Sequence, residues 1–196
     1  MITRTLLISL IAALTLTLTA CSKSEAPAAS PALTAAQSYD AVSTEGKGFT
    51  AGAIMSAHTA YVLFDPQCPH CGHLWQATQA LQKKVKFVWI PVSIINGKST
   101  SQGAALLTAA NPTESMTAHE TSLLAGNGGL PASDALSPEM EAAIKANTAL
   151  FNRLGLESVP FIVAKNARTG KVVTNVGAMT PEALTAWIGL DGLSTD

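Results

Sequence analysis

Short apolar runs and longer helical repeats follow one another along the chain and predict a layered α/β domain. Runs of apolar, β-branched and aromatic residues predict buried strands at 60–64, 86–95, 161–165 and 171–176. Apolar positions three and four apart predict helices at 69 to about 82–84, 100–110, 112–125, 138–154 and 180–189. From residue 39 to 58 three glycines interrupt a mixed pattern, which indicates a short strand and a turn.

The order of these elements predicts how the strands pair. A strand, a helix and a second strand with a crossover of this length imply a parallel, right-handed unit. We expect the second strand to bend or stop pairing near Pro91, which has no N–H to donate. More than 60 residues separate Ile95 from Pro160, too many for a loop, and their pattern indicates an all-helical insertion. The last two strands, joined by a short turn that ends in glycine, form a predicted hairpin.

The N-terminal segment is typical of a targeting signal. Residues 1–20 have Arg4 near the start, an apolar stretch too short to span a bilayer, and a small-residue ending. Leu18-Thr19-Ala20-Cys21 resembles the bacterial lipobox, in which the cysteine is lipidated after cleavage. The alternative is an ordinary signal peptide that leaves Cys21 free. Residues 21–38 are rich in small residues and proline, which predicts a flexible tether.

Charge and cysteine content narrow the function. Only 13% of residues are charged and the formal net charge is −1, so nothing indicates a nucleic-acid partner. The chain has three cysteines, and once Cys21 is assigned to the anchor only Cys68 and Cys71 remain. In an oxidising compartment this pair is then the one disulfide that the monomer can form, which predicts a redox-active dithiol.

The motif Cys68-Pro69-His70-Cys71 lies where a strand gives way to a helix. We expect Cys68 at the helix N-terminus to be the exposed nucleophile and Cys71, one turn inside, to be the buried resolving thiol. Pro69 suits the first helical turn, and His70 can give a hydrogen bond or partial positive charge to the Cys68 thiolate. Alternatively, His70 is merely exposed.

Metal binding is the other chemistry that such a motif allows. A structural zinc site needs four ligands, and no further cysteine is available. Cu(I) remains an alternative, since the thiolates of Cys68 and Cys71 with the imidazole of His70, and that of His73 nearby, suit it. The remaining histidines and methionines considered have no cluster around them and are expected in the core or at the surface: His58, His119, Met55, Met116 and Met179.

The element order and the stretch from Tyr61 to Cys71 resemble the bacterial Dsb thiol:disulfide interchange proteins, in particular the catalytic domain of the DsbG/DsbC branch. The resemblance covers nearly all of residues 59–190. It implies a thioredoxin-like fold, with a mixed central sheet flanked by helices, over residues 39–196, and a helical insertion at about 96–157. It also implies that Pro160 is cis and that Val159 presents its backbone to an extended substrate.

Three features depart from those relatives. Thioredoxin and DsbA carry a buried acid six residues before the first cysteine, where this chain has Val62, as the DsbG branch does. Proton transfer to Cys71 must then use another group or water. Val159 resembles DsbA, whereas DsbC and DsbG have threonine before the cis-proline. Residues 22–58 are too short for the N-terminal dimerisation domain of DsbC and DsbG, so we expect a monomer.

Together these features predict a periplasmic thiol:disulfide oxidoreductase without a cofactor, lipid-anchored through Cys21. Ser22 after the lipidated cysteine suggests sorting to the outer membrane. Cys-Pro-His-Cys and Val159 favour an oxidase of protein cysteines that works with a membrane redox partner. The alternatives are a DsbG-like reductase or isomerase and a Cu(I)-binding module.

Overall fold

The computed structural model describes residues 33–133 and 135–192, so the predicted signal peptide, Cys21 and most of the predicted tether lie outside the described residues. The described part contains a five-stranded sheet in the order β1-β3-β2-β4-β5. Its strands are β1 (Phe49–Gly52), β2 (Thr59–Phe64), β3 (Lys86–Pro91), β4 (Phe161–Lys165) and β5 (Val172–Val176). β2 and β3 are parallel and the other pairs are antiparallel, so the predicted mixed sheet and the parallel unit are confirmed.

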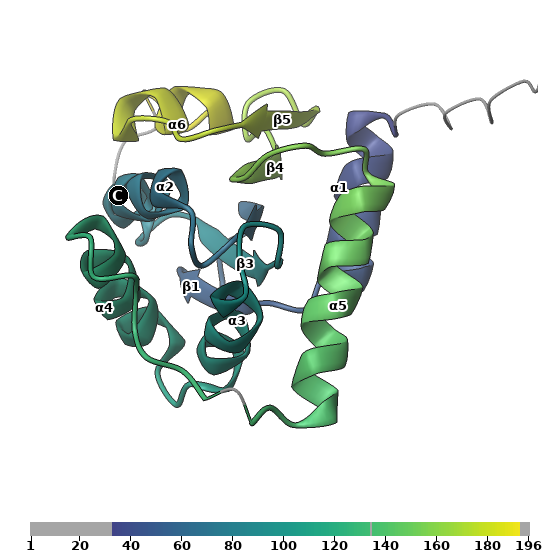
Figure 1. Ribbon diagram of the computed structural model, residues 1–196. Helices are drawn as coiled ribbons and strands as arrows, with labels where there is room; N and C mark the ends of the chain where they lie inside the picture. Colours follow the sequence, from purple (N-terminus) through teal and green to yellow (C-terminus); the bar gives the residue numbers. More distant parts are fainter. Residues whose placement is uncertain (1–32, 134, 193–196) are drawn as a thin grey trace, which may run out of the picture. The chain divides into compact units, whose positions relative to one another are not determined.

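Helices flank this sheet, as Figure 1 shows. They are α1 (Ala35–Glu45), α2 (Pro69–Thr78), the 3-10 turn η1 (Gln79–Leu81), α3 (Lys98–Thr108), α4 (Pro112–Leu124), α5 (Pro138–Arg153) and α6 (Pro181–Ile188). Four of them begin with proline in the first turn, where the missing N–H would have had no partner in any case. Within the described residues no helix is long and apolar enough to cross a membrane.

Alternation along β2 assigns the two layers of helices to opposite faces of the sheet. Successive side chains of a strand point to opposite faces. Tyr61 meets Tyr39 of α1 edge to face, with ring centroids 5.4 Å apart. Its neighbour Val62 lies opposite Trp89 of β3, which meets Trp75 of α2 at 5.2 Å. Therefore α1 covers one face, and α2 covers the other through a cluster of large aromatic rings.

Helix α1 corrects the sequence-based boundary of the tether. It begins at Ala35, inside the segment assigned to the tether, and it replaces the mixed segment expected from residue 39. The reason is local: the Thr34 hydroxyl accepts from the Gln37 amide while the Gln37 side chain accepts from the Thr34 amide, which is a complete capping box. Tyr39 then fixes the helix to the sheet. The short strand expected in this region is present as β1.

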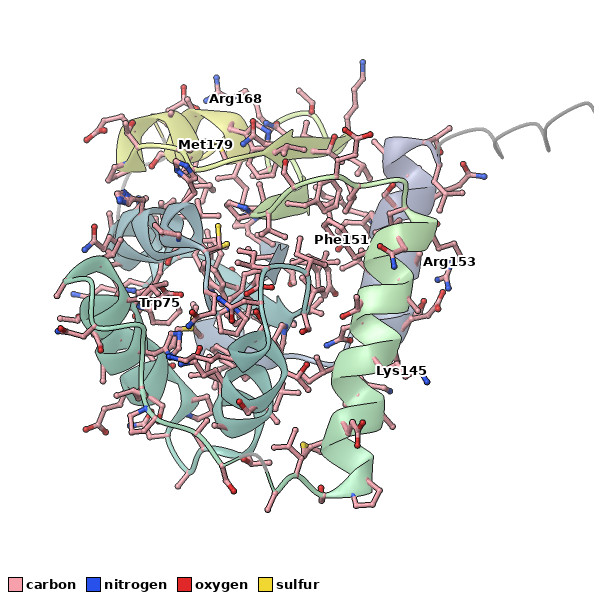
Figure 2. All side chains as sticks on the ribbon, in the orientation of Figure 1. Trp75, Lys145, Phe151, Arg153, Arg168 and Met179 are labelled. Carbon is pink, nitrogen blue, oxygen red and sulfur yellow. The ribbon has the colours of Figure 1, made fainter. Side chains whose placement is uncertain are left out.

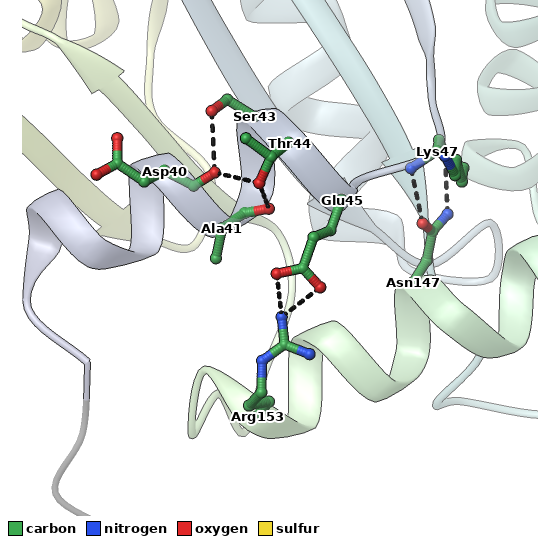
Figure 3. A network of polar contacts seen from close by, with 8 residues as sticks. All are labelled: Asp40, Ala41, Ser43, Thr44, Glu45, Lys47, Asn147 and Arg153. Atoms are coloured by element: carbon green, nitrogen blue, oxygen red, sulfur yellow. Dashed lines mark hydrogen bonds and ion pairs between the residues drawn. The ribbon is translucent and has the colours of Figure 1, made fainter.

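Helices α1 and α5 lie side by side on one flank of the domain (Figure 1). Figure 3 shows the polar contacts that join them and the chain after α1. Asn147 of α5 is fully buried; its amide accepts from the Lys47 N–H at 2.8 Å and donates to the Lys47 and Pro91 carbonyls at 2.7 and 2.9 Å. Arg153 pairs with Glu45 at 2.6 Å, although both side chains are about half exposed.

The long connection between β3 and β4 is helical, as predicted, and comprises α3, α4 and α5. These helices do not form one separate lobe. α3 lies between the other two and packs on both; α4 also packs on α2 and β1, whereas α5 also packs on β3 and α1. Figure 2 shows the two sides of α5: Lys145 points away from the domain, and Phe151 points inward, where it is 3% exposed. The insertion therefore brings α4 beside the helix that carries both cysteines.

Candidate active site

Cys68 is the N-cap residue of α2 and follows β2 by a short turn. Its carbonyl oxygen accepts from the amides of Cys71 and Gly72, which closes the first helical turn. Pro69 takes the first helical position and has no N–H, so the amides of His70 and Cys71 are the first in the helix and act on the Cys68 sulfur by lowering its pKa. The motif thus forms the helix start that its sequence predicts.

Cys68 is less exposed than we expected. Its relative exposure is 5% and that of Cys71 is 0%. The expectation of an exposed nucleophile is therefore wrong for this conformation, because the segment before β4 covers the sulfur: Cys68 Sγ donates to the Val159 carbonyl oxygen at 3.5 Å. Both cysteines are free thiols in the structure. Cys71 lies one turn inside the helix, as predicted.

The surroundings of Cys68 favour its thiolate. A hydrogen bond from the Cys71 thiol, and after it the amides of Cys71 and His70, lower the pKa of Cys68 to about 6 against the opposing effect of burial. The imidazole charge of His70 makes the smallest of these contributions, because that side chain is exposed. His70 therefore acts on Cys68 more through its backbone than through its ring.

Cys71 is held as a thiol. Burial, with the hydrogen bond to Cys68 and the negative charge there, raises the pKa of Cys71 well above that of an ordinary thiol. The pKa values of the two thiols in one motif are thus shifted in opposite directions. This asymmetry is what a dithiol needs if one sulfur is to attack and the other is to stay protonated until it is used.

The Val159–Pro160 peptide bond is cis, as the resemblance implied. It stands just before β4, whose first residue Phe161 pairs with Val176, and the Pro160 carbonyl accepts from the Gly177 amide at 2.8 Å. The sheet order places β4 next to β2, so the start of β4 and the end of β2 lie at the same edge. Val159 and Cys68 meet there.

Asp65, between β2 and the motif, was not singled out from the sequence. It is fully buried and its carboxylate accepts four hydrogen bonds. Oδ1 accepts from the Gln67 amide and the Ser99 hydroxyl at 2.8 and 2.7 Å, and Oδ2 from the amides of Ile94 and Ile95 at 2.7 and 3.0 Å. Asp65 thus fixes the turn before Cys68 to the segment after β3 and to α3.

A second polar network joins the same turn to the insertion. The side-chain nitrogen Nε2 of Gln67 donates to Gln102 Oε1 and to the Gly128 carbonyl at 2.5 and 2.9 Å. His119 of α4 is 1% exposed; its Nε2 lies 2.7 Å from the Pro66 carbonyl oxygen, and its Nδ1 accepts from the Leu130 amide at 3.1 Å. Because Nδ1 accepts, Nε2 carries the hydrogen and donates to Pro66. His119 is a packing residue, as expected, but it also orients α4 against the active-site turn.

Glu120, the next residue of α4, was not singled out from the sequence. It is fully buried, and among the described residues no group donates to either carboxylate oxygen. The buried residues of α4 are Met116, His119 and Glu120, at the spacing of one helix face. An acid at an apolar position of a helix is a signal in the sequence that could have identified it. Val62, by contrast, is a core residue with 0% exposure.

No three metal-binding side chains are gathered in residues 33–133 and 135–192. The rings of His70 and His73 lie with centroids 6.2 Å apart and tilted by 52° on the exposed side of α2, whereas the two cysteines are buried. The Cu(I) alternative therefore rests on Cys68 and Cys71 alone. His73 and Met55 are exposed and Met116 is core, as expected for residues outside the site.

A family model described as a thioredoxin-like domain matches residues 54–190. With this match and the observed fold, the chain belongs to the thioredoxin-like domain family. Among characterised proteins it is similar to the thiol:disulfide interchange protein DsbG of Pseudomonas aeruginosa, with 27% identity over 144 residues that cover 70% of this chain and 54% of DsbG. The chain spans about half the length of that relative.

Solved structures share the fold at low sequence identity. The catalytic domain of Proteus mirabilis ScsC superposes with a TM-score of 0.60 at 16% identity, covering 78% of this chain and 93% of that one. The thiol-disulfide exchange protein alpha-DsbA2 from Wolbachia pipientis gives a TM-score of 0.58 at 18% identity, covering 81% and 93%. These similarities show the fold alone.

Proposed function

We propose that the chain exchanges disulfides with cysteines of protein clients through the Cys68–Cys71 pair, and that it acts as an oxidase. The observation that carries the proposal is the asymmetry of the two sulfurs: the pKa of Cys68 is lowered to about 6, while burial raises that of Cys71. A client cysteine forms a mixed disulfide with Cys68, and the second sulfur, Cys71 or another client thiol, resolves it.

The lowered pKa of Cys68 also supports the oxidising direction. A stabilised thiolate stabilises the reduced protein and makes its disulfide a stronger oxidant. Thioredoxin and DsbA, with thiolate pKa values of about 7 and 3.5, have potentials of about −270 and −120 mV. At about 1.4 kcal/mol, or about 30 mV, per pKa unit, a pKa near 6 corresponds to about −240 to −195 mV. We expect this chain to be more oxidising than thioredoxin.

The edge of the sheet that carries Cys68 suits an unfolded polypeptide. β3 is parallel to β2, and β5 ends beside the start of β4, so the ends of both strands lie at this edge. Three large apolar side chains are exposed after or at those ends: Ile94 (38%), Ile95 (46%) and Val176 (54%). We propose that they contact apolar client segments while the backbone of Val159, beside Pro160, pairs with the client chain.

The test has two parts. Cys71→Ser should trap mixed disulfides with client proteins, and Cys68→Ser should trap none; the opposite pattern would reverse the assignment of the two sulfurs. The reduction potential, measured against glutathione, should lie above that of thioredoxin. A value of about −270 mV or lower would rule out the oxidase.

The similarity to DsbG favours a second candidate, the reduction or isomerisation of client cysteines. The two candidates differ in the redox state of the Cys68–Cys71 pair in intact cells. An oxidase is kept as a disulfide and a reductase or isomerase as a dithiol, in each case by a membrane partner. Acid trapping of cells followed by alkylation and mass spectrometry reads out this state directly.

We further propose that the protein is periplasmic, monomeric and anchored by lipid at Cys21, at the outer membrane. The signal-like residues 1–20 and the Leu-Thr-Ala-Cys sequence support this location. A multiply acylated N-terminus would make the anchor effectively permanent, since each buried CH₂ contributes about 0.8 kcal/mol. Mass spectrometry of the mature N-terminus is the test, and an unmodified residue 21 would refute the anchor.

A further inference from the structure

Helix α4 places an acid against the helix that carries both cysteines. α4 and α2 run antiparallel: Thr117 Oγ1 accepts from Trp75 Nε1 at 3.3 Å, and one turn further Glu120 lies against Gly72. Figure 2 shows Trp75 between the two helices. His119, through its contacts to Pro66 and Leu130, fixes the rotation of α4 about its axis. The side chain of Glu120 is therefore directed at the buried side of α2.

Gly72, the residue after Cys71, makes room for this carboxyl. A Cβ on Gly72 would stand 2.6 Å from Glu120 Oε2 and 3.1 Å from Leu124 Cγ. Because heavy atoms do not approach this closely, any other residue at position 72 would displace the carboxyl or the helix. The glycine that follows the Cys-x-x-Cys motif thus allows Glu120 to reach the backbone beside Cys71.

Burying the Glu120 carboxyl costs free energy, and no hydrogen bond from the described residues offsets this cost. Glu120 has 0% exposure, and within the described part of the chain neither oxygen accepts or donates a hydrogen bond. A buried polar group without a partner normally has a reason. Burial, and after it the negative charge of Cys68, raise the pKa of Glu120 to about 9, so the acid is protonated at neutral pH.

Among the described residues, the ionisable groups that interact electrostatically with Glu120 are Cys68 and Cys71 of the adjacent helix α2. The other ionisable side chains on the elements around it point elsewhere. His119 is turned to Pro66 and Leu130, and Asp65 is occupied by its four donors. The rest are exposed to solvent: Lys98 on α3, Glu114 on α4, and His70 and His73 on α2.

We propose that Glu120, supplied by the helical insertion, is the group that exchanges a proton with Cys71 during disulfide exchange. Thioredoxin and DsbA have a buried acid at the position of Val62, whose side chain cannot transfer a proton. Glu120 would supply that proton transfer from another element of the fold. This inference rests on the proposed function and assigns the path of its proton. Glu120 acts on the reaction through Cys71 and is not a group that attacks the client.

The proton and electron balance is simple in both directions. When a client thiolate attacks Cys68 Sγ, the new S–S bond joins client and Cys68, the Cys68–Cys71 bond breaks, and the Cys71 sulfur leaves with the electron pair. Glu120 gives it the proton, so the buried site never holds a bare Cys71 thiolate. In reverse, Glu120 takes the proton from Cys71, whose sulfur attacks Cys68 while the client leaves as a thiolate. At neutral pH Glu120 rests in the protonated form that the first direction uses, and this is the direction that oxidises the client.

The test measures reduction of the oxidised, full chain by dithiothreitol between pH 5 and 10, followed by tryptophan fluorescence. Glu120→Gln should slow this step about a hundredfold at pH 7, the lower end of the range for general acid catalysis. Because only a protonated Glu120 can help, the ratio of wild-type to variant rates should fall toward one at high pH. Glu120→Asp should restore part of the rate, and Glu114→Gln, an exposed acid on the same helix, should leave it unchanged.

A matched reaction separates the proton path from a general disturbance of the site. In the Cys71→Ser background, reduction of the mixed disulfide of Cys68 with glutathione releases either Cys68 or glutathione, and no sulfur leaves from position 71. Glu120→Gln should therefore change this rate less than about twofold. If Glu120→Gln fails to fold, Glu120→Met, apolar and of similar length, should show the same selective loss.

Equal rates and pH profiles for wild type, Glu120→Gln and Glu120→Met would overturn the inference, and so would equal slowing of the two reactions by Glu120→Gln. A wild-type disulfide that dithiothreitol reduces no faster than a model disulfide, with no client exchange, would instead refute the proposed function itself.

Discussion

Cys68 Sγ lies 3.5 Å from the carbonyl oxygen of Val159, although 91 residues separate the two in the sequence. The contact joins the start of α2 to the segment that enters β4. It buries the attacking sulfur to 5% exposure and places the backbone that is proposed to bind a client directly beside it. On the proposed function, client binding and attack by Cys68 would therefore take place at one point on the edge of the sheet.

The Cys68 thiolate should titrate near pH 6 in the reduced protein. Its alkylation by iodoacetamide should rise tenfold per pH unit below 6 and level off above it, while Cys71 stays unmodified in the native fold. Cys71→Ala should raise this pKa by about 1, the value of one hydrogen bond to a charged group, because the Cys71 thiol is the largest cause of the shift. His70→Ala should change it less, since the backbone amide remains. A larger effect of His70→Ala would contradict this ranking.

Asp65→Asn should destabilise the fold by about 3 kcal/mol, because an amide has only one acceptor oxygen for four donors. Its NH₂ group would face either the Gln67 amide or the amides after β3. Urea unfolding gives the free energy of unfolding. The exposed Asp40→Asn serves as a control and should stay within about 0.5 kcal/mol of wild type. Similar losses of stability for both variants would mean that Asp65 does not fix the turn before Cys68 to the segment after β3.

The two contacts of α5 drawn in Figure 3 should differ widely in energy. Asn147→Asp places a carboxylate oxygen against the Lys47 and Pro91 carbonyls, which are both acceptors, and should cost about 2–4 kcal/mol. Arg153→Ala removes a half-exposed ion pair with Glu45 and should cost less than about 1 kcal/mol. Chemical denaturation of both variants checks the order, and a larger loss for Arg153→Ala would reverse it.

Glu120 should make the stability of the oxidised protein fall with rising pH. In the unfolded chain its carboxyl ionises near pH 4.3. In the folded protein burial raises its pKa in both redox forms, and the negative charge of Cys68 adds to the shift, to about 9, only in the reduced form. In the oxidised protein Glu120 therefore titrates between these two values. The stabilising difference is complete below pH 4.3 and is lost as pH rises through this window, at up to about 1.4 kcal/mol per pH unit. Glu120→Gln should remove this slope, whatever its effect at one fixed pH. Parallel pH profiles of wild type and variant would show that Glu120 is not buried as an acid.

The apolar edge beside Cys68 should matter for protein clients and not for small thiols. Replacing Ile94 and Ile95 by serine should raise KM for a reduced, unfolded client about three- to tenfold, since each side chain loses only part of its apolar contact. Reaction with dithiothreitol should stay unchanged. Ile54 and Met55, exposed beyond β1 at the opposite edge of the sheet, provide the control, and an equal effect of replacing them would mean that the apolar edge is not the client surface.

The sequence by itself determined the features that depend on local chemistry. The period of apolar residues fixed the strands from β2 onward and the helices from α2 to α6, because side-chain burial repeats every two residues in a strand and every 3.6 in a helix. The cysteine count and the helix start after β2 identified Cys68 and Cys71. Helix α1 was missed because its apolar face is weak. The capping box at its start is the sequence signal that could have identified it.

Only the tertiary structure decided which distant residues surround the two sulfurs. The burial of Cys68 by Val159, the four donors around Asp65, and the approach of Glu120 to Gly72 all depend on how β4, the segment after β3 and α4 pack around one helix. No local pattern encodes such contacts, because burial and hydrogen-bond partners follow from the packing of whole elements. The motif in the sequence names the reacting atoms, and the helical insertion supplies the acid proposed to serve them.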